Sequence, residues 1–263
     1  MLQKFDDGLS DMRAGIGMWR VWVALAGEDI SDQHRRTTLG PLWLLINYLA
    51  FAGTFVFVFR HGDSGATNYA AYVAIGLFVW FYLMETVNQG VSLFLREESF
   101  IKGTTLPLSV YIMRLATQVT IRAIYAFAGC LAILLVSGVD LSPAWGWSAL
   151  GIIVIVVTTP AVIILCAFLG AYLPDSQFIV SNLMRLGMFL TPVFWMYEGA
   201  GGVRGAFYFW NPFTYFLEIV RAPILTGEVP ICALALCLGI GLAAWVLALI
   251  LFAWFRRDVV FVL

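Results

Sequence analysis

Three ionisable side chains fall inside segments that are otherwise apolar: Glu85, Arg122 and Arg185. A charge at the centre of a bilayer costs about 3 kcal/mol on insertion scales, so such groups usually face the interior of a helix bundle and pair there. We therefore predict that Glu85 pairs with one of the two arginines. Such a pair either fixes helix packing or lines a polar conduit, and the sequence leaves both roles open.

No other group of residues in the sequence indicates catalytic chemistry. His34 and His61 lie far apart, and no two carboxylates fall where they would share a pocket. The phosphate-binding pattern G-x-x-x-x-G-K-[ST] is missing, so a chain that performs work would take its energy from elsewhere. The four cysteines match no zinc-ligand spacing. We predict that the chain is not an enzyme and holds no metal or cofactor.

The segments that carry these charges are long and apolar. The 263 residues are 62% hydrophobic and only 12% charged, a balance that a soluble domain could not solvate. A helix needs roughly 20 apolar residues to cross a bilayer. We predict an all-α integral membrane protein with six transmembrane helices, near 41–59, 69–93, 110–137, 147–172, 177–197 and 231–255. Pro192 is expected to kink the fifth helix.

The distribution of positive charge predicts the orientation. Ten of the 15 Lys and Arg residues lie before the first predicted helix, between the second and third, or after the sixth. By the positive-inside rule, both termini are expected in the cytoplasm. We find no cleavable signal peptide, and we expect a protein of the bacterial inner (plasma) membrane. The net charge of −1 makes nucleic acid an unexpected partner.

Residues 1–40 are predicted to form a cytoplasmic segment ahead of a membrane domain that spans 41–263. Within this segment, the stretch 9–27 has apolar residues at helical spacing: Leu9, Met12, Ile16, Trp19 and Val23. This pattern predicts an amphipathic helix that lies in the membrane interface. A solvated helix packed on a soluble partner is the alternative.

Two further stretches are too polar to span a membrane. Residues 95–107 are the most charged cytoplasmic loop after the N-terminal segment, and we predict a short helix and turn that can dock a partner. An ordinary connector is the alternative. Residues 197–229 are aromatic-rich and lie on the external side, with a turn signal at Asn211-Pro212. We predict two short re-entrant helices joined there, or an aromatic belt at the interface. Glu218 and Arg221 have a spacing that allows an ion pair.

Three motifs in this order make the chain resemble the type-2 ABC transporter permeases that export polysaccharides or lipid-linked glycans. The first is HRRTTLGPLWLL (34–45), in which the matching residues are Arg35, Arg36, Leu39, Gly40, Pro41 and Trp43. The second is KGTTLPLSVYIMR (102–114). The third is FLTPVFW (189–195) followed by NPFTYFLEIVRAPIL (211–225). The similarity covers nearly the whole chain.

The resemblance implies a half-transporter that pairs with a second copy of itself. Each copy would bind a separate cytoplasmic ABC ATPase, which would hold ATP and magnesium. The stretch 95–107 then corresponds to the coupling helix, with ATPase contacts from Arg96, Glu97, Glu98, Ser99, Phe100, Ile101 and Lys102. The segment 197–225 corresponds to external gating helices. The substrate would be a lipid-linked glycan such as O-antigen or capsular polysaccharide.

The aromatic content is compatible with such a substrate, because the C–H face of a sugar can stack on an aromatic ring. Candidates for the glycan path and gate are Phe78, Trp80, Phe81, Tyr82, Trp195, Tyr197, Tyr208, Trp210, Asn211, Pro212, Glu218 and Arg221. Lipid contact or core packing is the alternative for each aromatic residue. An exporter of a drug or small lipid is the main rival function. An ATP-independent channel or secondary transporter is a further alternative, but secondary transporters often contain internal sequence repeats and we find none here. A membrane-embedded enzyme would need a cluster of catalytic residues, and we find none in the sequence.

Overall fold

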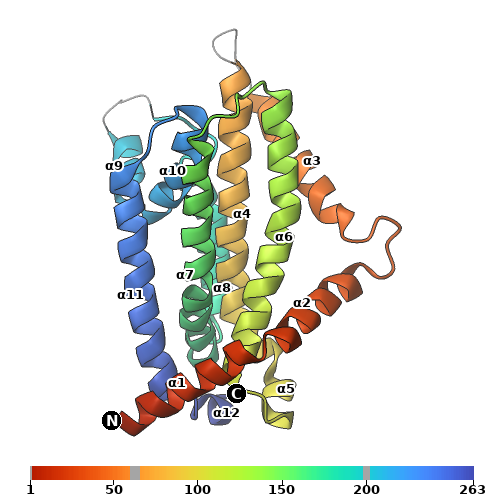
Figure 1. Cartoon of the computed structure of the whole chain (residues 1–263), viewed down its shortest axis with the longest axis vertical. Helices are drawn as coiled ribbons and strands as arrows, with labels where there is room; N and C mark the ends of the chain where they lie inside the picture. Colours follow the sequence, from red (N-terminus) through yellow and green to blue (C-terminus); the bar gives the residue numbers. More distant parts are fainter. Residues whose placement is uncertain (1, 60–65, 198–201) are drawn as a thin grey trace.

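Four long helices form the centre of the molecule, a computed structural model that describes residues 2–59, 66–197 and 202–263 (Figure 1). They are α4 (Ala66–Arg96), α6 (Leu108–Val136), α7 (Trp145–Tyr172) and α11 (Ile231–Phe255). Among the described residues, these are the four helices that are long and apolar enough to cross a membrane. They confirm the second, third, fourth and sixth predicted spans.

α4 is the central helix and packs against α6, α7, α8 and α10. Its contact with α7 is very close at one point. A Cβ atom added at Gly170 would lie 1.8 Å from the backbone oxygen of Val91. Small residues allow such backbone approach between helices in a membrane, where hydrophobicity alone does not drive helices together.

The first and fifth predicted spans correspond to shorter helices. α3 (Leu42–Phe59) is apolar and covers the predicted range. α8 (Ser176–Leu190) ends seven residues before the predicted boundary at 197. Thr191 has an extended backbone, which is the conformation favoured for a residue that precedes proline. The prediction that Pro192 kinks this helix is therefore wrong, because the helix ends before it and residues 191–195 turn back.

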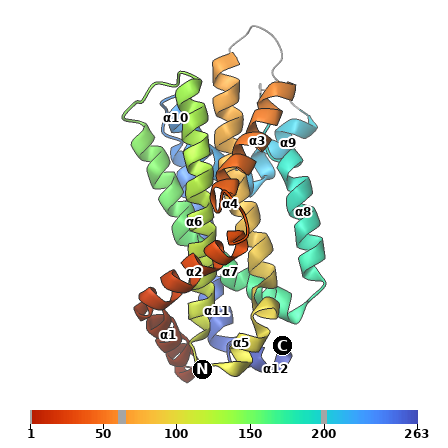
Figure 2. The ribbon, with the colours of Figure 1, turned by 90° about the vertical axis from the view of Figure 1, so that its right-hand side faces the viewer.

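Two helices lie across one end of the bundle, which we call the base (Figures 1 and 2). They are α1 (Leu2–Gly17) and α2 (Trp19–His34), separated by a turn at Met18. The single predicted helix over 9–27 is thus broken, next to a glycine, the residue that loses most entropy in a helix. α5 (Glu98–Gly103), α12 (Val259–Val262) and both chain ends also lie at the base.

The opposite end of the bundle, the top, carries the predicted pair of short helices. They are α9 (Val203–Trp210) and α10 (Pro212–Leu225), and they meet at Asn211 as predicted. The Asn211 side-chain oxygen accepts a hydrogen bond from the Phe213 amide at 3.0 Å, and Pro212 occupies the first turn of α10. A proline there sacrifices no helical hydrogen bond, so the two residues together fix the start of α10.

We predict that Gly170→Ala lowers the thermal unfolding midpoint of the purified protein in detergent, because the new methyl group would press on the Val91 carbonyl. Gly239→Ala in α11 is the matched control, since a Cβ there meets nothing within 4 Å. Alanine is favoured over glycine in a helix by about 1 kcal/mol, so the control should be neutral or stabilising. Equal midpoints for the two variants would contradict the close contact of α4 and α7.

Candidate functional site

One arginine at the base joins three helical segments. Arg114, near the start of α6, donates from Nε and Nη2 to the two carboxylate oxygens of Asp29 in α2, each at 2.6 Å. Its Nη1 donates to Oε2 of Glu97, just before α5, at 3.1 Å. The Arg114 side chain is only 17% exposed, so these charge-assisted bonds are largely shielded from solvent. Arg114 therefore ties the N-terminal helices to the turn that leads into α5.

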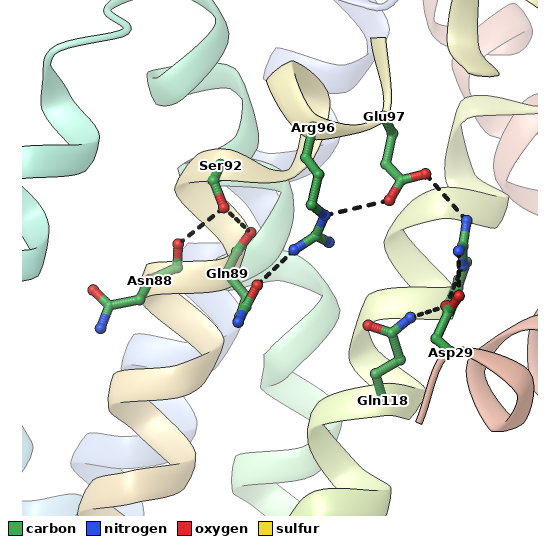
Figure 3. Close-up of polar contacts among 8 residues, drawn as sticks. Asp29, Asn88, Gln89, Ser92, Arg96, Glu97 and Gln118 are labelled. Atoms are coloured by element: carbon green, nitrogen blue, oxygen red, sulfur yellow. Dashed lines mark hydrogen bonds and ion pairs between the residues drawn. The ribbon is translucent and has the colours of Figure 1, made fainter. Parts of the chain in front are cut away.

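Neighbouring side chains extend this contact into a network at the end of α4 (Figure 3). Arg96 donates to Glu97 at 3.3 Å and to Gln89 at 2.6 Å. The side-chain amide of Gln118 donates to Asp29. The network borders a polar pocket of about 420 Å³ between α2, α4 and α6. Glu97 thus receives hydrogen bonds from two arginines, one before it in the chain and one in α6.

The seven residues predicted to contact an ATPase lie together on α5, in the turn before it and at the last residue of α4. Glu97 and Ile101 point into the protein and are buried. Lys102 and Glu98 form an ion pair on the surface at 2.7 Å. Phe100 is 57% exposed. The remaining two, Arg96 and Ser99, are exposed. Glu97 and Ile101 therefore anchor the short helix to the rest of the protein, and the aromatic ring of Phe100 is exposed on its outer side.

A second carboxylate anchors α1 to the bundle. Asp11 accepts hydrogen bonds from the Ser109 amide at 3.2 Å and from its hydroxyl at 2.8 Å. It also pairs with Arg256, at the end of α11, at 3.2 Å. Gly15 allows this approach, because a Cβ atom there would lie 2.1 Å from the Ser109 hydroxyl oxygen. Sequence reasoning missed Asp11, Asp29, Arg114 and Arg256; the only signal was an excess of charge next to the predicted helix ends.

Glu85 pairs with Arg122, which confirms the prediction that it would pair with one of two arginines. Arg122 also donates to the side-chain oxygen of Gln33, at the end of α2, at 2.7 Å. Arg185 takes no part in this pair and is exposed on α8. The pair borders a second pocket of about 420 Å³ between α3, α4 and α6, which combines Asn47, Asn88 and Gln89 with the rings of Phe51 and Phe81.

The four aromatic candidates of α4, which fall within five residues, face three different regions. Phe81 borders the pocket at the Glu85–Arg122 pair, whereas Phe78 and Tyr82 border an apolar crevice between α4, α6 and α7. Trp80 points toward α8 and α10. Successive helical residues are separated by about 100°, so the three consecutive rings at residues 80–82 cannot share one surface. Their role in a glycan path therefore stays a prediction, in which the four residues would contribute to different surfaces.

A third pocket, of about 520 Å³, brings Trp80 together with Trp210 and Asn211, and adds Phe207 and Phe213. It lies between α4, α8, α9 and α10. Trp80 is fully buried, and within the described part of the chain its indole nitrogen has no hydrogen-bond partner. This pocket is the most aromatic of the three and unites candidates that are 130 residues apart in sequence.

The other aromatic candidates near the top form separate contacts. Tyr197 stacks on Tyr208 with ring centroids 4.8 Å apart. Burial raises the pKa of Tyr208 to about 12, helped by the nearby Glu218 carboxylate. The indole nitrogen of Trp195 donates to the Phe189 carbonyl at 3.0 Å. These contacts hold the chain that follows α8.

Arg221 in α10 is the most deeply buried charge described, with a side chain only 2% exposed. Its Nη1 donates to the Pro192 carbonyl at 2.9 Å, and its guanidinium carbon lies 3.6 Å from the centroid of the Tyr72 ring. The predicted pair with Glu218 is confirmed at 3.6 Å. Nε and Nη2 have no hydrogen-bond partner among the described residues. Space for Nη2 comes from Gly76, where a Cβ atom would lie 2.2 Å away.

The motif at 34–45 forms the turn from α2 into α3. Gly40 has φ +53°, a conformation that other residues adopt only with strain. The amide of Trp43 then donates to the Gly40 carbonyl at 3.3 Å, and Pro41 begins the following turn. Arg35 pairs with Asp32 on the surface at 3.5 Å, and Arg36 is exposed. The motif therefore sets the direction of the chain where it leaves the base.

The model of the ABC-2 type transporter family matches residues 20–225, which is more than half of the chain. The chain belongs to the ABC-2 type transporter family. Two proteins of Klebsiella pneumoniae, each named O-antigen export system permease protein RfbA, are 25% identical to it over 186 residues, 69% of this chain and 71% of theirs. A protein of that name from Myxococcus xanthus is 26% identical over 179 residues, 65% of this chain and 66% of its own. The predicted family resemblance is confirmed, and this ABC-2 transporter subunit is a multi-pass membrane protein.

We predict that Asp29→Asn loosens α2 of this ABC-2 transporter subunit, because it halves the charge that Arg114 faces. Amide hydrogen exchange in α2 should rise, and stability should fall by about 1–3 kcal/mol. Asp32→Asn is the matched control, since Asp32 lies on the same helix and pairs with Arg35 only at the exposed surface. Its expected effect is within about 1 kcal/mol. Equal exchange in both variants would contradict the role given to Arg114.

We predict that Gly76→Ala displaces the Arg221 guanidinium from Tyr72 and Pro192 without altering either partner. The thermal midpoint in detergent should fall in the otherwise unchanged protein. In an Arg221→Ala background the same methyl group has room, so its cost should largely vanish, with a coupling energy of about 1 kcal/mol or more. Additive effects of the two substitutions would show that Gly76 does not make space for Arg221.

Proposed function

We propose that the chain is the permease subunit of an ATP-driven exporter that moves a lipid-linked polysaccharide of the O-antigen type across the bacterial inner membrane. The observation that carries the proposal is the similarity over about two thirds of the chain to relatives named O-antigen export permeases. The aromatic and amide side chains of the pockets next to α4 support a sugar substrate, because aromatic faces stack on sugars and amides bind their hydroxyl groups.

The topology we propose has six membrane crossings, in which α3 and α8 complete the four long helices. The base would face the cytoplasm, because both termini and ten of the 15 Lys and Arg residues lie in the segments assigned to that side. α1 and α2 would lie in the membrane interface, with exposed apolar side chains such as Ile16 and Trp19 toward lipid. α9 and α10 would re-enter the membrane from outside.

The base is suited to receive force from a separate ATPase. ABC-2 subunits generally work with an ABC ATPase, which would hold the ATP and magnesium. We propose that α5 docks in that partner through Phe100, while Glu97 carries the displacement to Arg114 and onward to Asp29. Because ion-paired groups in a shielded site resist separation, α5 and α2 would move as one unit.

A second copy of the chain would complete the path. α8 is in contact mainly with α4, and most of its apolar side chains are exposed, among them Phe178, Leu183 and Leu186. Arg185 is exposed on the same helix, where a lone charge facing lipid would be costly. Pairing along α3 and α8 would cover the apolar side chains and place Arg185, with the pockets bordered by Phe81 and Trp80, on a shared path.

We predict that the tagged chain, purified from its native membrane, brings with it a subunit that contains the phosphate-binding pattern of ABC ATPases. Phe100→Ala should reduce that recovery and the export of glycan to the cell surface, because it removes the exposed ring of α5. Trp147→Ala is the matched control, since Trp147 is also an exposed ring but lies at the start of α7 and not on α3, α5 or α8. Normal surface glycan in cells that lack the chain would overturn the proposed substrate class, and export without any ATPase would overturn the mechanism.

A further inference from the structure

An apolar crevice of about 340 Å³ lies on a side of α4 that faces neither α3 nor α8. α6 and α7 form its other two walls, and they flank α4 in Figure 1. Small side chains open it, with Ala123 on α6 and Ala149 on α7, while Phe78 lies on the α4 side. α6 separates this crevice from the pocket at the Glu85–Arg122 pair, so the two cavities share no lining residue.

The crevice offers no free polar group to a ligand. The hydroxyl of Tyr82 lies 2.7 Å from the hydroxyl oxygen of Thr159 and 3.4 Å from that of Thr120. Thr120 in turn donates to the Ala116 carbonyl at 2.7 Å. A bound water needs about two to four polar partners, and every hydroxyl in this wall already has one inside the protein. Neither water nor a polar ligand is therefore favoured in the crevice.

The open side of the crevice faces the surroundings of the bundle at mid-height. Ile124 and Ile153 at its rim are 60% and 56% exposed, and both lie well inside helices able to cross a membrane. What surrounds them is therefore hydrocarbon. An empty crevice would forfeit dispersion contacts along all of its walls, which favours filling it with the apolar chains at hand.

We propose that this crevice binds an acyl chain of a bilayer phospholipid, held between α6 and α7 against Phe78 and Tyr82. The acyl chain fills the space between α6 and α7 and is therefore a constant part of the packing on this face of the protein. The occupant is a membrane lipid and not the transported glycan lipid, since the charged side chains Glu85, Arg122 and Arg185 all lie away from this face.

Photolabelling of the full chain tests the site. The protein is placed in lipid nanodiscs of phosphatidylethanolamine and phosphatidylglycerol with a trace of phospholipid that carries a diazirine at mid-chain, and labelled peptides are mapped by mass spectrometry. Labelling at Ile124 and Ile153 should exceed that at Leu242 of α11 about tenfold, a preference of about 1.4 kcal/mol. Leu242 is the control for bulk lipid because it is 69% exposed and lies well inside another spanning helix. Labelling that follows exposure alone would overturn the proposal.

A filled crevice gives a second and independent readout. Ala149→Phe places a ring on the open wall, and Ala243→Phe on the exposed surface of α11 is its matched control. The tenfold preference should disappear in the first variant and persist in the second, with unchanged thermal midpoints. A preference that survives Ala149→Phe would overturn the site, and stronger labelling by a polyprenyl phosphate diazirine than by the phospholipid would overturn the assigned occupant. If Ala149→Phe does not fold, the labelling ratio measured on the unsubstituted chain still tests the proposed site.

Discussion

The base depends on the bidentate hydrogen bond from Arg114 to Asp29. The third guanidinium nitrogen of Arg114, Nη1, donates to Glu97. A guanidinium removed from water is costly unless its donors are used, and here each of its three nitrogens donates to a carboxylate. Two carboxylates around one cation leave an excess of negative charge, which Arg96 offsets through its own bond to Glu97. The geometry of α2, α5 and α6 is thus fixed jointly, and none of the three can shift alone without breaking an ion pair that is partly shielded from solvent.

Helix contacts above the base rely on close approach more than on apolar bulk. The lipid is as apolar as the side chains, so helices gain by dispersion and by backbone proximity. Gly170 against Val91 and Gly151 against Ile219 are contacts that a methyl group would disrupt. The same principle places α1 on α6 through Gly15. Polar anchors and glycine contacts therefore act at the same junctions, and each makes the other possible.

Hydropathy predicts the helices that cross the bilayer, but it predicts few of the side-chain pairs that join those helices. The four long helices agree with their predicted ranges within three residues, because length and apolarity are local properties. The end of α8 at Leu190 depends on the backbone preference before Pro192, which a window average does not register. The sequence could predict that Glu85 pairs with an arginine, since a lone intramembrane charge is costly. Its choice of Arg122 over Arg185 depends on helix order and rotation, which no local pattern contains.

The arginines at the two ends of the molecule differ in how many of their hydrogen-bond donors have partners. At the base, every guanidinium nitrogen of Arg114 donates a hydrogen bond, whereas Arg221 near the top leaves Nε and Nη2 without partners among the described residues. It is held instead by the Tyr72 ring, by one carbonyl of the turn after α8 and by the Glu218 carboxylate at 3.6 Å. An incompletely satisfied cation loses less when its surroundings move, because fewer bonds must break. If the base receives a displacement from a partner ATPase, as proposed, it would transmit that displacement as a unit, and the contact of α10 with the end of α8 is where the top would yield.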